Sequence, residues 1–149
     1  MSQSFIKLTY HIVFATKNRV PVLNKEIRSC LYEYCGGITR NLKGVLVEIG
    51  GIEDHIHALV SLSPNINLAE FVQKLKANSS RWLNKTYFSD FAWQTGYGAF
   101  TVSESQIERV RNYIRNQEIH HNKYGGFENE FESLLKAHGI DYNRDYLWK

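Results

Sequence analysis

The chain has 149 residues, of which 43% are hydrophobic and 22% are charged, and its formal net charge at pH 7 is +3. This composition excludes a disordered, collagenous or coiled-coil protein, and the length suits a single domain over 1–149. No apolar run approaches the roughly 18 residues of a membrane span, and the N-terminal segment lacks the pattern of a secretory signal. We therefore expect a cytoplasmic protein that has no membrane partner.

The first predicted elements are a strand and a helix. Residues 5–15 alternate between two sets of side chains, which is typical of a strand. One side of this strand carries Ile6, Leu8, Tyr10, Ile12 and Phe14. Apolar residues then recur three and four positions apart over 25–43, which predicts a helix. Cys30 and Cys35 lie on this helix, and we expect free thiols rather than a disulfide.

Two strands and a second helix follow. Alternation predicts a strand over 45–49, which the Gly50-Gly51 pair closes, and another strand over 55–62. Asn67 stands three residues before a glutamate, which is the spacing of a helix N-cap and its back-reaching partner. A helix therefore begins after Asn67. Its inward residues are Leu68, Phe71, Val72, Leu75 and Leu83.

The rest of the chain predicts one more strand and two helices. The strand covers 97–102 and is flanked by glycines. Ser103 and Gln106 form a second capping pair, which opens a helix with Ile107, Val110 and Ile114 on its apolar side. A last short helix ends near residue 139. The segment 104–149 thus forms the helix that carries Tyr113 together with a C-terminal tail.

This order of elements is that of an α+β, ferredoxin-like βαββαβ fold with an antiparallel sheet. Right-handed crossovers bring the strands over 5–15 and 55–62 side by side at the centre of the sheet. Both crossover helices then cover the same apolar face. His55 and His57 point to the opposite face, and so does His11, because side chains alternate along a strand.

The histidine pair is the most informative feature of the sequence. In a strand, residues i and i+2 share a face, so His55 and His57 lie about 6.6–6.8 Å apart along it. Two imidazoles at that separation can hold one metal ion, with each nitrogen about 2.1 Å from it. The alternative is a half-buried strand whose histidines bind nothing. Since two ligands do not complete a site, a third must come from another element.

Tyr113 and Gln117 lie one helical turn apart and so share a stripe. This stripe borders the apolar side of the predicted helix, from which a phenol and a carboxamide can face the sheet or a partner subunit. In the alternative, Tyr113 closes the hydrophobic face and keeps its hydroxyl in water. For His120 and His121, which end the same helix, capping or solvation is the better interpretation than metal binding.

Four segments in this order resemble the single-tyrosine HUH transposases, small insertion-sequence enzymes that move DNA as single strands. The segments are LTYHIVFATKNR, GGIEDHIHALV, WQTGYGAFTVS and VRNYIRNQEIHHNK. The resemblance implies that His55, His57 and Gln117 bind a divalent metal, Mg²⁺ or Mn²⁺, and that Tyr113 is the catalytic nucleophile. It further implies cleavage and rejoining of DNA at the ends of an insertion sequence, through a covalent 5′-phosphotyrosine.

The same resemblance implies a homodimer and single-stranded DNA with hairpin ends as the substrate. For contacts to DNA we single out four basic residues with no acid between them: Lys74, Lys76, Arg81 and Lys85. The alternative for each is a solvated helix face. Trp82 lies among them and either stacks on a base or packs in the core. His11 either contacts a phosphate or orients a ligand.

Two other classes of function compete with the transposase. A ferredoxin-like sheet with exposed aromatic residues can bind single-stranded nucleic acid without cleaving it. A structural zinc site could instead use His55, His57 and His121, although the chain has no paired cysteine motif. A domesticated relative of a transposase, which keeps the site and serves its host, is a third possibility.

Overall fold

The computed structural model describes residues 3–119 and 126–147. Its elements are β1 (Thr9–Ala15), α1 (Lys25–Asn41), β2 (Val45–Ile52), β3 (His55–Ser61), α2 (Leu68–Thr86), β4 (Gly98–Thr101), α3 (Ile107–Arg115), α5 (Phe127–Ala137) and α6 (Arg144–Leu147). The strands form an antiparallel sheet in the order β2-β3-β1-β4. The predicted α+β fold is therefore confirmed, with β1 and β3 at the centre. Within the described ranges, no helix has the length and apolarity needed to cross a bilayer.

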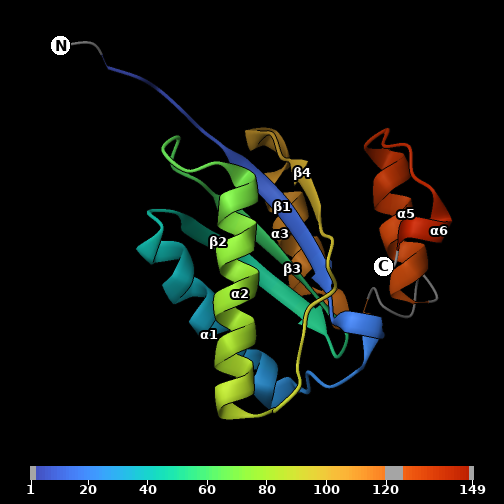
Figure 1. Cartoon of the computed structure of the whole chain (residues 1–149). Helices are drawn as coiled ribbons and strands as arrows, with labels where there is room; N and C mark the ends of the chain where they lie inside the picture. Colours follow the sequence, from blue (N-terminus) through green and yellow to red (C-terminus); the bar gives the residue numbers. More distant parts are fainter. Residues whose placement is uncertain (1–2, 120–125, 148–149) are drawn as a thin grey trace.

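The two central strands bury side chains on both faces of the sheet. Helices α1 and α2 cover the first face (Figure 1), and Ile12 of β1 and Ile56 of β3 belong to the core beneath them. On the second face, Val13 of β1 packs with Phe127 and Phe131 of α5, and α3 lies against β2 and β3. Both predicted crossover helices thus cover one face, and the helices that follow β4 cover the other.

β1 begins at Thr9, later than the alternation predicted. The register pairs Thr9 with Ser61, which is the last residue of β3, so residues 5–7 extend past the sheet. Ile6, expected on the buried side, is 52% exposed. The alternating pattern thus continues beyond the strands with which it could pair.

The prediction that Gly50-Gly51 closes the second strand is wrong, because β2 runs through both glycines to Ile52. The glycine at position 50 serves close packing instead. A Cβ atom added to Gly50 would lie 2.3 Å from the carbonyl oxygen of Ile114 on α3. The backbone of α3 therefore rests directly on β2, and a side chain at position 50 would block this approach.

The two predicted helix N-caps differ in outcome. Asn67 caps α2, because its Oδ1 accepts a hydrogen bond of 2.7 Å from the Glu70 backbone N–H. Ser103 makes no such bond, so that prediction is wrong. A short 3-10 turn over Glu104–Gln106 leads into α3, and the Ser103 hydroxyl lies 3.3 Å from the Ser105 hydroxyl instead. The turn thus takes the place of a side-chain cap.

We expect Gly50→Ala to destabilise the fold by about 1–3 kcal/mol, the usual cost of forcing an extra group into a packed interior. Gly37→Ala is the matched control, because Gly37 lies within α1 and its added Cβ would be 3.9 Å from the nearest atom, on the Arg40 side chain. Better helix propensity should stabilise that variant by up to about 1 kcal/mol. Urea unfolding measures both changes, and an unchanged free energy of unfolding for Gly50→Ala would contradict the contact.

Both cysteines are free thiols, as predicted, but they differ in accessibility. Burial raises the pKa of Cys35 to about 12, whereas Cys30 is partly exposed. Since the thiolate is the reactive form, we expect iodoacetamide at pH 8 to modify Cys30 in the folded protein and Cys35 only after unfolding. Mass spectrometry of the labelled peptides checks this, with Cys30→Ser as the control that removes the fast reaction. Fast labelling at position 35 would refute it.

Candidate metal and nucleophile site

His55 and His57 lie on the second face of β3, where both side chains are fully buried. Ile56 between them packs in the opposite core, so the predicted separation of faces is confirmed. Phe127 of α5 stacks on the His55 ring, and the two ring centroids are 4.0 Å apart. The two imidazoles are thus enclosed rather than displayed on an open sheet.

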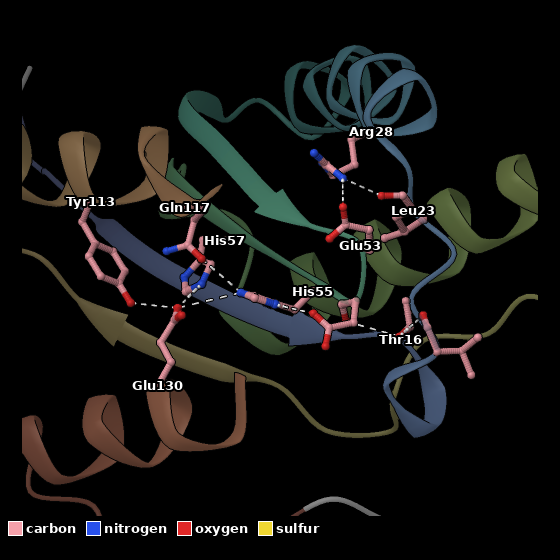
Figure 2. Close-up of polar contacts among 11 residues, drawn as sticks. Thr16, Leu23, Arg28, Glu53, His55, His57, Tyr113, Gln117 and Glu130 are labelled. Carbon is pink, nitrogen blue, oxygen red and sulfur yellow. Dashed lines mark hydrogen bonds and ion pairs between the residues drawn. The ribbon is translucent and has the colours of Figure 1, made fainter. Parts of the chain in front are cut away.

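Asp54 fixes the orientation of His55. The Nδ1 atom of His55 lies 2.8 Å from Asp54 Oδ1, so the ring donates its N–H to the carboxylate. Nε2 then faces the interior of the site, toward Gln117 and Glu130 (Figure 2). A carboxylate behind a histidine holds the tautomer that leaves the other nitrogen ready to bind a metal ion.

His11 has the corresponding position behind His57. The Nε2 atom of His11 lies 2.8 Å from His57 Nδ1, and the two rings are stacked with centroids 5.0 Å apart. Burial, together with the nearby His57, lowers the pKa of His11 well below its ordinary value, so His11 is neutral and can accept this hydrogen bond. Its position suits the ligand-orienting role that the sequence left open. Phosphate contact by His11 stays a prediction.

Two oxygen donors join the imidazoles. Gln117 follows the break at Asn116 that ends α3, is buried, and places Oε1 3.1 Å from His55 Nε2. Glu130 reaches in from α5 and places Oε1 2.8 Å from His57 Nε2 and 3.8 Å from His55 Nε2. The structure thus brings the predicted trio together and adds a carboxylate that sequence reasoning missed.

Glu130 is ionised although only 1% of its surface is exposed. Burial alone would raise its pKa, but the close contact with His57, with smaller contributions from His55 and Tyr113, outweighs burial and lowers the pKa to about 2. The pKa of His57 is also lowered, mainly by burial. At neutral pH this part of the cluster therefore holds a carboxylate and a neutral imidazole, which are the forms that bind a cation.

The sequence did contain a signal for Glu130. It lies three positions after Phe127 and one before Phe131, on the apolar side of the last helix. An acid in that position must find a buried polar partner, because burying an unpaired charge is costly. Of the three acids at positions 128, 130 and 132, only Glu130 is buried.

This donor set fits a divalent cation. His55, His57 and Glu130 each offer one ligand atom, and these atoms lie within 4.8 Å of one another. The carboxamide oxygen of Gln117 is a neighbouring fourth donor. Mixed nitrogen and oxygen donors suit Mn²⁺ well, and the two oxygens also suit Mg²⁺.

Tyr113 reaches the same carboxylate. Its phenol donates a 2.8 Å hydrogen bond to Glu130 Oε1, the oxygen that faces both histidines (Figure 2). Its ring meets His57 and His11 edge-on, with centroid distances of 5.6 and 6.1 Å. The phenol, two imidazoles and a carboxamide therefore converge within a single chain.

Contacts on two sides hold the helix of Tyr113 against the sheet. Arg111 and Arg115 both pair with Glu48 of β2, at 3.6 and 2.9 Å. Arg28 of α1 pairs with Glu118 at 2.9 Å, just beyond the end of α3. Together with the backbone contact at Gly50, these pairs fix where Tyr113 and the residues after it lie relative to β3.

The basic residues predicted to contact DNA lie elsewhere: Lys74, Lys76, Arg81 and Lys85 are all on α2. α2 covers the first face of the sheet (Figure 1). The histidine cluster lies on the second face, under Phe127 of α5. Lys74 pairs with Glu70 at 3.0 Å, and Arg81 and Lys85 are exposed. The structure therefore does not bring this basic set to the cluster, and phosphate contact stays a prediction for it.

Lys76 differs from its basic neighbours because its ammonium group is already engaged. It donates hydrogen bonds of 2.5–3.1 Å to the backbone carbonyls of Gln94, Thr95 and Gly96. Its surroundings suit a residue that holds the segment before β4. Trp82 likewise has a protein partner, since it stacks on Tyr34 with ring centroids 4.9 Å apart. The histidines at 120 and 121 lie outside the described residues.

Comparisons with known proteins find similar chains in one family. The model of a family described as IS200-like transposases matches residues 4–117. The ISDra2 transposase TnpA of Deinococcus radiodurans is 28% identical over 120 residues, which cover 74% of this chain and 84% of that protein. The transposase for insertion sequence element IS200 of Salmonella typhimurium (strain LT2) is 32% identical over 120 residues, covering 72% and 75% of the two chains.

Solved structures give the same picture of the fold. The crystal structure of a candidate transposase from Deinococcus radiodurans R1 is similar with a TM-score of 0.64 and 28% identity, over 78% of this chain and 98% of that chain. A REP-associated tyrosine transposase bound to a REP hairpin has a TM-score of 0.61 and 14% identity, over 81% and 73%. The family match ends at Gln117, so Glu130 of α5 lies outside it.

We expect Asp54→Asn to weaken Mn²⁺ binding about 10–100-fold, the usual cost of removing the partner behind a metal-binding histidine. The uncharged amide of asparagine accepts the His55 N–H more weakly than a carboxylate does. The His55 ring is therefore held less firmly in its metal-binding orientation. Isothermal titration with MnCl₂ measures the affinity. Asp90→Asn, an exposed acid away from the site, is the control. Equal affinities for the two variants would show that Asp54 has no orienting role.

Proposed function

This chain belongs to the IS200-like transposase family, and we propose that it cleaves and rejoins single-stranded DNA through a covalent 5′-phosphotyrosine. One observation carries the proposal: the Tyr113 phenol and the two imidazoles face the same oxygen of Glu130. A nucleophile that is held beside a cation-binding cluster suits attack on a phosphodiester, where charge builds on the phosphate oxygens.

The proposed reaction is a transesterification. The Tyr113 oxygen forms a bond to phosphorus, the bond from phosphorus to the 3′-oxygen breaks, and the phenolic proton ends on the released 3′-hydroxyl. A second DNA 3′-hydroxyl later attacks the 5′-phosphotyrosine and restores Tyr113. The energy of the phosphodiester bond is kept throughout, so no nucleotide cofactor is needed. Glu130 orients the phenol through its 2.8 Å hydrogen bond.

A divalent metal is part of this proposal. His55, His57, Gln117 and Glu130 are the residues that would hold it, with Mg²⁺ or Mn²⁺ as the ion. When bound, the ion would polarise the scissile phosphate and stabilise the leaving oxygen. Asp54 and His11 keep the two imidazoles turned toward that position.

The proposed partner is single-stranded DNA with hairpin ends. Support comes from the family and from one structural neighbour, which is bound to a REP hairpin. Lys74, Arg81 and Lys85 are the residues that we propose for phosphate contacts, since their side chains reach solvent on α2. The homodimer that the family resemblance implies would join two complete sites, because Tyr113 meets the histidine cluster of its own chain.

We expect Tyr113→Phe to abolish a covalent protein–DNA adduct while single-stranded DNA binding is retained. The test uses labelled single strands taken from the DNA that flanks the gene, incubated with Mn²⁺ and resolved on a denaturing gel. Tyr97→Phe, an exposed tyrosine away from the site, is the control and should keep the adduct. Chelation of the metal should also remove it.

Two results would overturn the proposal. An adduct formed equally by Tyr113→Phe would remove Tyr113 from its role. DNA binding that survives chelation, without cleavage under any metal, would favour a non-catalytic nucleic-acid-binding module instead.

A further inference from the structure

A cavity of about 520 Å³ opens beside the site, between the end of β4, the outer side of α3 and the end of α5. Its volume lies in the range of about 300–1,000 Å³ that is usual for pockets that bind small molecules and cofactors. His11 and Tyr113 belong to its lining. The cavity is therefore continuous with the proposed reaction centre, because both of these residues also contact His57.

The lining of the cavity is positively charged on one side and apolar on the other. Arg109 of α3 supplies the charge, and no ion pair of its guanidinium occurs among the described residues. Val110 of α3 and Leu134 of α5 supply apolar surface. No acidic residue is among the described residues that line it. An anion with a flat or apolar body is the kind of ligand that such walls favour.

The rim adds an aromatic surface and polar groups. His138, which follows α5, is exposed and stacks on Phe100 with ring centroids 4.3 Å apart. Ser103 and Gln106 bring a hydroxyl and a carboxamide from the turn before α3. A nucleobase has a face for stacking and an edge for hydrogen bonds. The ring of His138 suits the face, and the side chains of Ser103 and Gln106 suit the edge.

We propose that this cavity receives one nucleotide of the DNA strand, the one next to the phosphate that Tyr113 attacks. This inference rests on the proposed function and names a subsite for its substrate. Tyr113 lines the cavity and its hydroxyl bonds to Glu130 of the metal-binding cluster, so a phosphate at that hydroxyl leaves the adjoining nucleotide beside the cavity. Arg109 pairs with the next phosphate, and the base turns out of the strand into the cavity, as in other enzymes that enclose a single base.

Filling the cavity tests the proposal. Ala137 is an exposed residue of the lining, at the end of α5, so Ala137→Trp occupies the cavity without disturbing the core. Ser133→Trp adds the same bulk on an exposed part of α5 that does not line the cavity, and it is the matched control. The probes are the four deoxynucleoside 5′-monophosphates, titrated into each full-length protein and followed by NMR.

We expect at least one nucleotide to bind the parent protein and Ser133→Trp alike, and to bind Ala137→Trp at least tenfold more weakly. Arg109→Ala is a second variant. It should bind a single-stranded oligonucleotide more weakly, and the slope of log affinity against log salt concentration should fall by about one, as for the loss of one phosphate contact. Equal binding by Ala137→Trp and Ser133→Trp, or no binding of any nucleotide to the parent, would overturn the subsite.

A second experiment distinguishes a nucleotide within a DNA strand from a free nucleotide as the occupant of the cavity. An oligonucleotide with an abasic residue beside the cleavage position should bind the parent protein more weakly than intact DNA, and Ala137→Trp should not distinguish the two. If the abasic change has no effect on the parent, the cavity does not hold a DNA base. If the parent forms no adduct with any DNA but binds nucleotides in the cavity, the proposed cleavage fails while the nucleotide site stands.

Discussion

The constraint on which the site depends is the burial of two imidazoles on the second face of β3. Buried polar groups need hydrogen-bonding partners, so His55 and His57 require a set of polar neighbours around them. Asp54 and His11 supply partners for the outward nitrogens, while Gln117 and Glu130 face the inward ones. The helices that cover this face therefore bring polar side chains to one point of an otherwise apolar layer.

The Nε2 atoms of His55 and His57 face the same carboxylate, that of Glu130, as the phenol of Tyr113. Because Glu130 Oε1 lies 2.8 Å from both His57 Nε2 and the Tyr113 hydroxyl, a shift of α5 changes the surroundings of the donors and of the nucleophile together. α3 has less freedom to shift, since its backbone rests on Gly50 and its arginines pair with Glu48. In this arrangement α3 fixes the position of the tyrosine, and α5 completes its polar environment.

The sheet also divides the molecule into two chemical surfaces. The basic residues belong to α2, which covers the first face (Figure 1), and the cluster with its neighbouring cavity lies on the second. A DNA strand that contacts both must pass around an edge of the sheet. The cavity opens at the end of β4, which is one of the two edge strands, and Lys76 holds the segment just before that strand.

The sequence by itself determined the order of the strands and crossover helices and the opposite faces of Ile56 and the histidine pair, whereas the predicted helical stripe of Tyr113 and Gln117 is interrupted, because α3 ends at Arg115. The order and the opposite faces follow from the spacing of apolar residues, which recur every two positions in a strand and about every 3.6 positions in a helix. This spacing is set by residues close together in the sequence and does not depend on the rest of the chain. Only the tertiary structure decided that Gly50 admits the backbone of α3 and that Glu130 joins the cluster. The same holds for the engaged ammonium of Lys76. These features depend on contacts between segments far apart in the chain, and no local period specifies which distant surfaces will meet.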